Sequence, residues 1–181
     1  ELNRVDSLFA EMLEQYPQEE PVHRLFGMYL SSRKDFSRAE EQYAIAADLA
    51  PTNPENWLQL IGLYLYQEKY AEVIRVGKRA IQYVPDQKDI YMYVAVASAQ
   101  TKSYDEALSM LETGLNYVEE NDAGTKSFFY GQMGDVYHSA GDKEKSYEMY
   151  EKAPEHIEVS FPVKFGVIAD IENMQTLLFN F

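Results

Sequence analysis

The chain has 181 residues, of which 46% are hydrophobic and 25% are charged, as expected of a globular protein. Its 30 acidic and 16 basic residues give a formal net charge of −14, which argues against a nucleic-acid partner because it repels phosphate. The chain has no cysteine, which excludes disulfides and thiolate sites, and no apolar run approaches the roughly 20 residues that span a bilayer, so we expect no membrane span.

A period of 34 residues organises most of the chain. Pro17, Pro51 and Pro85 are evenly spaced, since 51 − 17 = 34 and 85 − 51 = 34. A fixed period of this size is typical of a solenoid. Each period holds two apolar runs at helical spacing with a short polar turn between them, for example around Tyr64 and Tyr70, which predicts a helical hairpin.

We expect a repeat array over residues 1–153. In chain order it comprises a trailing helix at 2–15 and four hairpins that begin near residues 20, 54, 88 and 125. The last hairpin begins late because five extra residues lie near 119–123. Small residues such as Gly27, Gly114 and Gly134 are expected where helices approach closely, with tyrosine and phenylalanine side chains filling the space beside them.

Local signals mark several helix ends. Asn53 precedes Pro54 and is expected to cap the helix that starts there. Ser103 and Glu106 have the spacing of a capping box at the next helix start. Gly141 is expected to end the first helix of the last hairpin in a left-handed conformation.

The repeat pattern stops after Ala153. Over residues 157–167 apolar and other residues alternate strictly, which is typical of a strand, although Pro162 argues against a central one. A short helix is expected after Asp170. We expect the extension at 154–181 to cap the last hairpin, to dock in a groove as a ligand within the same chain, or to pair with a second chain as a homodimer contact.

The periodic residues resemble those of the tetratricopeptide repeat (TPR), whose signature is W-x₂-L-G-x₂-Y…A-x₃-F…P. The residues that carry the resemblance are Trp57, Leu60, Ile61, Tyr64, Val73 and Pro85, then Ala39, Tyr43 and Pro51, and then Met133, Gly134 and Tyr137. The resemblance covers residues 1–153. Ile61 stands where the signature has glycine.

This resemblance implies an all-α, right-handed superhelix, an α-α solenoid whose first helices line a concave groove. At the positions that match the family's carboxylate clamp only Arg24 is basic, so we do not expect that mode of binding. Tyr66 and Tyr93 are the leading expected anchors. The residues expected to line the groove are Arg24, Met28, Leu58, Leu65, Tyr66, Met92, Tyr93, Val96, Phe128, Gln132, Asp135 and His138.

The expected function is that of a non-catalytic protein-interaction scaffold that binds an apolar peptide or helix in its groove. Tyrosine, methionine and leucine on a concave wall suit such a ligand. Asp135 and His138 lie one turn apart, but no nucleophile or ligand cluster accompanies them, so we expect no catalytic or metal site. No cofactor is expected. The alternative is a regulatory or partner-recruiting segment of a larger multidomain enzyme or assembly.

Overall fold

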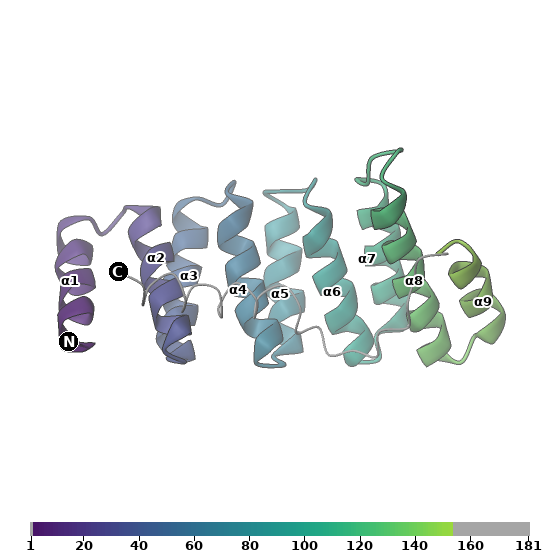
Figure 1. Cartoon of the computed structure of the whole chain (residues 1–181), viewed down its shortest axis with the longest axis horizontal. Coiled ribbons are helices and arrows are strands. Elements are labelled where there is room, and N and C mark those ends of the chain that lie inside the picture. Colours follow the sequence, from purple (N-terminus) through teal and green to yellow (C-terminus); the bar gives the residue numbers. More distant parts are fainter. Residues whose placement is uncertain (1, 154–181) are drawn as a thin grey trace. The chain divides into compact units, whose positions relative to one another are not determined.

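The computed structural model describes residues 2–153, and over this range the chain forms nine α-helices and no strand (Figure 1). The prediction of an all-α chain of helical hairpins is therefore confirmed for this part of the chain. The extended pattern at 157–167 and the helix after Asp170 lie outside the described residues, as does the rest of the extension at 154–181.

Residues up to Gln67 belong to one compact unit and the described residues from Glu68 onward to a second. The helices of the first unit are α1 (Leu2–Gln15), α2 (Glu20–Ser32), α3 (Phe36–Leu49) and α4 (Pro54–Tyr66). Those of the second are α5 (Tyr70–Ile81), α6 (Lys88–Gln100), α7 (Tyr104–Leu115), α8 (Ala123–Ala140) and α9 (Lys143–Glu151). Within each unit, helices that follow one another along the chain pack together, and in the second unit α6 also contacts α8.

Four helix starts are capped by a side chain, and one expected cap is absent. Asn53 accepts a hydrogen bond from the Glu55 amide (3.2 Å), as predicted, and Asp35, Asp122 and Asp142 cap α3, α8 and α9 in the same way. The capping box predicted at Ser103 is wrong, because its side chain makes no bond to the helix amides. Glu106 instead forms an ion pair with Lys78 of α5, which draws its carboxylate away from the helix start.

The turns inside the hairpins share one left-handed residue. Lys34, Glu68 and Lys102 have φ values of 62°, 56° and 62°, and Gly141 has a φ of 86°. The first three are 34 residues apart in sequence, so the period that places the helices also places this conformation. Glycine at 141 was predicted from its freedom in this region, whereas the other three turns use side chains that adopt it at a cost.

The periodic prolines serve as hydrogen-bond acceptors. The carbonyl of Pro51 accepts from Trp57 Nε1 (2.7 Å), and the carbonyl of Pro85 accepts from the Tyr91 hydroxyl (2.8 Å). His23 Nε2 donates in the same way to Pro17 (3.1 Å). In each case the donor is six residues after the proline. Each bond ties the loop before a hairpin to the hairpin's first helix, so His23 is a structural residue of the repeat.

Close helix approaches occur at glycines opposite aromatic rings. A Cβ atom at Gly27 would lie 2.7 Å from the Tyr43 ring, and one at Gly134 would lie 2.5 Å from the Tyr150 ring. At Gly114 a Cβ would meet Phe129 at 2.8 Å. The rings therefore occupy space that any larger residue would need, which is the pairing of small and aromatic residues that the sequence predicted.

Candidate functional site

The predicted groove residues of the first unit have different surroundings. They are Arg24, Met28, Leu58, Leu65 and Tyr66. The Arg24 side chain pairs with Glu20 one turn earlier (2.9 Å), so its charge is already matched. Leu65 is only 8% exposed, whereas Tyr66 is 40% exposed and its ring lies edge-on to Phe36 with centroids 5.3 Å apart. Tyr66 is thus the exposed aromatic of this set, held from behind by a second ring.

In the second unit the structure brings three predicted residues together. The predicted set is Met92, Tyr93 and Val96 on α6, and Phe128, Gln132, Asp135 and His138 on α8. Val96, Gln132 and Asp135 line one pocket between these helices. Phe128 and His138 are exposed and lie outside the pocket lining, and Met92 packs partly against the core beneath it.

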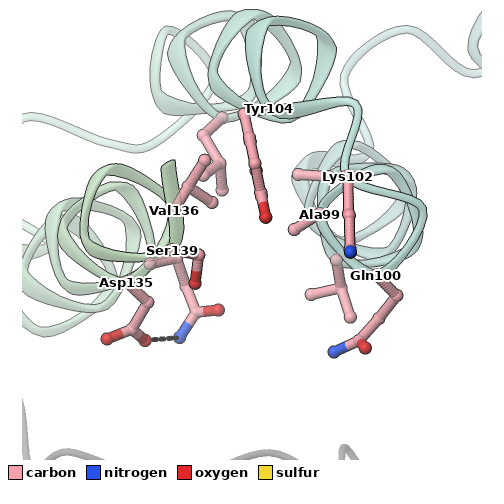
Figure 2. Close-up of a pocket in the computed structure, with 11 residues that line it drawn as sticks. Ala99, Gln100, Lys102, Tyr104, Asp135, Val136 and Ser139 are labelled. Carbon is pink, nitrogen blue, oxygen red and sulfur yellow. Dashed lines mark hydrogen bonds between the residues drawn. The ribbon is translucent and has the colours of Figure 1, made fainter. Parts of the chain in front are cut away.

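This pocket has a volume of about 270 Å³ and is formed by α6, by the turn after α6, by α7 and by α8. Its lining residues are Ala95, Val96, Ala99, Gln100, Lys102, Tyr104, Leu111, Gln132, Asp135, Val136 and Ser139. Figure 2 shows the Tyr104 hydroxyl and the Lys102 ammonium group directed into the cavity, with Asp135 and Ser139 on the wall formed by α8.

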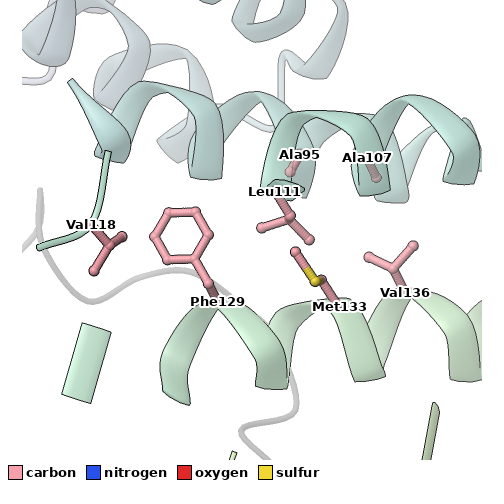
Figure 3. Close-up of a cluster of buried hydrophobic side chains, with 7 residues drawn as sticks. All are labelled: Ala95, Ala107, Leu111, Val118, Phe129, Met133 and Val136. Atoms are coloured by element: carbon pink, nitrogen blue, oxygen red, sulfur yellow. The ribbon is translucent and has the colours of Figure 1, made fainter. Parts of the chain in front are cut away.

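The apolar part of the pocket lining, called the floor below, belongs to a packed hydrophobic core. Ala95, Leu111 and Val136 line the pocket and also belong to the buried cluster that includes Phe129 and Met133 (Figure 3). Leu111 is 1% exposed. Because these three side chains pack against the core as well as facing the cavity, the floor that they form is a rigid apolar surface.

The α8 wall carries a hydrogen-bonded carboxylate. Asp135 Oδ1 accepts from the Tyr150 hydroxyl of α9 (2.8 Å), and Asp135 Oδ2 lies 3.5 Å from Gln132 Nε2, the contact dashed in Figure 2. Gln132 is 5% exposed, so its amide is held by burial as well as by this contact. The wall therefore presents a negative group whose oxygens are already partly used within the protein.

The residues on the pocket wall that faces α8 were not predicted from the sequence. Gln100, Lys102 and Tyr104 come from the end of α6, the turn and the start of α7, whereas the groove prediction considered first helices alone. Tyr104 was not among the residues expected to line the groove. The period gives no signal for Lys102, because it does not show which turn lies at a cavity.

Residues 2–153 contain neither a metal-binding cluster nor a membrane-spanning helix. No group of three or more histidine, aspartate or glutamate side chains is arranged to hold a metal ion there. None of the helices described in this range combines the length and the apolar character needed to cross a membrane. The pocket, with the α6 and α8 surfaces around it, is the candidate site.

No protein-family model matches the sequence, and no curated protein matches it. Solved structures do match. A crystal structure titled MamA has a TM-score of 0.67 at 15% identity and covers 93% of this chain and 87% of its own. A second MamA crystal structure has a TM-score of 0.68 at 17% identity, with 85% of each chain covered. For MamA 41-end from Desulfovibrio magneticus RS-1 the TM-score is 0.66 at 13% identity, with 81% and 80% covered.

At these identities the likeness concerns the fold alone. The chain shares the helical-repeat fold of the MamA structures, which agrees with the period in its sequence and with the paired helices of each unit.

Proposed function

We propose that the chain is a non-catalytic, TPR-like scaffold that binds a polypeptide segment with apolar side chains along the α6 and α8 surfaces. The observation that carries the proposal is the pocket with an apolar floor, whose lining includes Val96, Gln132 and Asp135. Its volume of about 270 Å³ falls below the roughly 300–1,000 Å³ usual for small-molecule and cofactor sites. A side chain of a bound peptide is an occupant of suitable size.

The surroundings of the pocket favour a polypeptide ligand. Tyr93 on α6 is half-buried and Phe128 on α8 is 43% exposed, so aromatic surface extends beyond the cavity. Rigid aromatic side chains contribute binding area at low entropic cost. A ligand with several apolar side chains gains contact along this surface, whereas a small molecule confined to the pocket does not.

The direct test is a selection from a random-peptide display library on the immobilised full chain, followed by measured affinities for the enriched peptides. Tyr93→Glu places a charge beside the pocket and is expected to weaken binding. Tyr147→Glu is the matched control, because Tyr147 on α9 is 68% exposed and lies outside both the pocket lining and the predicted groove. Failure to enrich any peptide, or equal binding by both variants, contradicts the proposal.

Tyr66 is the proposed anchor of a separate contact surface on the first unit. Tyr66→Glu is expected to weaken those selected peptides whose affinity is unaffected by Tyr93→Glu, and to leave the pocket-binding peptides unaffected. Equal loss for both groups of peptides would show that the substitution acts through stability and would remove Tyr66 from the binding surface.

We propose that residues 154–181 bind in the groove as a ligand within the same chain, rather than cap the last hairpin. The exposed residues of α9 are mostly charged: Lys143, Glu144, Lys145, Glu148 and Glu151. A terminal repeat needs a polar outer face. Because α9 is the last helix of the described array and its exposed residues are mostly charged, it already provides such a face. A chain ending at residue 153, first shown to be helical, is expected to bind selected peptides more tightly than the full chain. Aggregation of the short chain would support a cap instead, and loss of a dimer in sedimentation would support a homodimer contact.

A further inference from the structure

The charges around the pocket are matched on one wall and unmatched on the other. Among residues 2–153, Lys102 is the only cation that lines the pocket, and no carboxylate lies within ion-pair distance of its ammonium group. Some other lysines of the second unit are paired, for example Lys145 with Asp142 (3.2 Å) and Lys152 with Glu148 (2.7 Å), whereas Lys88 and Lys143, which do not line the pocket, make no ion pair among the described residues. An unpaired ammonium group at the edge of an apolar cavity is therefore a feature of this site.

The carboxylate on the α8 wall already has hydrogen-bond donors within the protein. Asp135 is the only carboxylate that the described residues contribute to the lining, and the Tyr150 hydroxyl and the Gln132 amide already contact its two oxygens. Lys102 has no such partner, and the Tyr104 hydroxyl beside it makes no hydrogen bond within the described residues (Figure 2). On the side opposite Asp135 the Lys102 ammonium group and the Tyr104 hydroxyl are therefore left to bind a ligand, together with the Gln100 amide, while the Ser139 hydroxyl lies on the Asp135 wall.

We propose that the pocket binds a segment of a partner protein in which an aliphatic side chain stands next to an aspartate or glutamate. The aliphatic side chain lies on the floor of Ala95, Leu111 and Val136. The neighbouring side-chain carboxylate accepts hydrogen bonds from Lys102 and Tyr104. The inference rests on the proposed function and adds the chemistry of the segment.

The size and the charge of the site agree with this ligand. A cavity of about 270 Å³ has room for roughly nine waters at about 30 Å³ each, which suits an apolar side chain and part of its neighbour. The net charge of −14 repels an acidic segment at a distance, but salt screens such repulsion beyond about 8–10 Å. At contact distance, the Lys102 ammonium group attracts the acidic side chain of the segment. A lysine or arginine in place of that acidic residue is repelled by the same charge.

The test begins with the peptides enriched on the full chain by display selection. They are expected to share an aliphatic residue beside Asp or Glu. Each is then synthesised with an amidated C-terminus, so that the carboxylate comes from the side chain, and in a second form with Gln or Asn replacing the acidic residue. We expect the neutral form to bind about three- to tenfold more weakly, as for a charge pair at the edge of an interface.

A double-mutant cycle assigns that loss to Lys102. Lys102→Gly is expected to weaken the acidic peptide by the same factor and to leave the neutral peptide unchanged, which is the signature of a direct pair. Because Lys102 has a φ of 62°, glycine is tolerated there and the fold is retained. Lys34→Gly is the matched control, since Lys34 has the same φ and repeat position in the other unit, and it is expected to leave both affinities unchanged.

Occupation of the floor is tested separately. Ala99→Leu places a larger side chain in the pocket and is expected to weaken the acidic and neutral peptides alike, with helicity confirmed by circular dichroism. Retained binding by this variant overturns the assignment to the pocket.

The outcomes separate this inference from the function on which it rests. Peptides that bind without an acidic residue, or that lose equal affinity in both forms with Lys102→Gly, overturn the inference and leave the scaffold function standing. A selection that enriches nothing overturns both. Enrichment of basic residues next to the aliphatic one overturns the charge argument and points to Asp135 instead.

Discussion

Replacing Gly141 with alanine is expected to destabilise the last hairpin through the backbone alone. Gly141 has a φ of 86°, and a Cβ atom added there meets no other atom within 4 Å. A non-glycine residue in the left-handed region costs roughly 1–2 kcal/mol, and alanine recovers about 0.4–1 kcal/mol by restricting the unfolded chain. The net expected loss is about 1 kcal/mol, measured as a lower urea midpoint at unchanged slope.

Gly124→Ala is the control for this prediction. Gly124 is in the first turn of α8, its φ is not positive, and its nearest contact to an added Cβ is 4.0 Å away. Alanine is therefore expected to raise the unfolding free energy by about 0.5 kcal/mol. The two substitutions are chemically identical and differ only in backbone conformation. A midpoint for Gly141→Ala equal to or above that of the wild type would refute the reasoning, whatever the control shows.

Three further predictions concern packing and pH. Gly134→Ala brings a Cβ to 2.5 Å from the Tyr150 ring and is expected to lower the unfolding free energy by about 1–3 kcal/mol in thermal melts; an unchanged midpoint would mean that the ring moves freely. The Lys145 amide holds the pKa of Asp142 below its ordinary 3.8, so its stabilising effect is complete above that pH and is lost as the pH falls further; Asp142→Ala is expected to flatten the acid limb of stability against pH, and an unaltered limb would contradict this. Burial raises the pKa of Tyr43 to about 12, so the unfolding free energy of the wild type falls as the pH rises from 10 to 12; Tyr43→Phe is expected to remove this fall in urea midpoints measured over that range, and an equally steep fall in the variant would contradict the assignment.

The period alone predicted much of the fold of residues 2–153. The first helices of the hairpins begin at Glu20, Pro54, Lys88 and Ala123. The cap at Asn53 and the left-handed Gly141 follow from local residue chemistry, which a sequence displays directly.

The wrong capping box shows where local reasoning fails. Ser103 and Glu106 have the required spacing, but Lys78 is 28 residues before Glu106 and competes for its carboxylate. A contact between α5 and α7 exists only after the helices have packed, so no pattern around residue 103 could reveal it.

The predicted groove residues came from the resemblance to the tetratricopeptide repeat, and three of them, Val96, Gln132 and Asp135, line the pocket between α6 and α8. The period does not show that a turn lies over the same cavity, so it gave no reason to include Lys102 or the Tyr104 hydroxyl. Which titratable groups remain unpaired depends on contacts between helices, and the pair between Asp135 and Tyr150 joins α8 to α9.

The most direct test of the binding surface is nuclear magnetic resonance with the ¹⁵N-labelled full chain, titrated with a peptide enriched on it. We predict that the largest shift changes fall on amides of pocket residues on α6, the following turn and α8, including Ala99, Lys102 and Val136, with little change at Tyr147 on α9. Shift changes concentrated on the outer face of α9, with the pocket amides unmoved, would contradict the proposal that this chain binds polypeptides through the α6 and α8 surfaces.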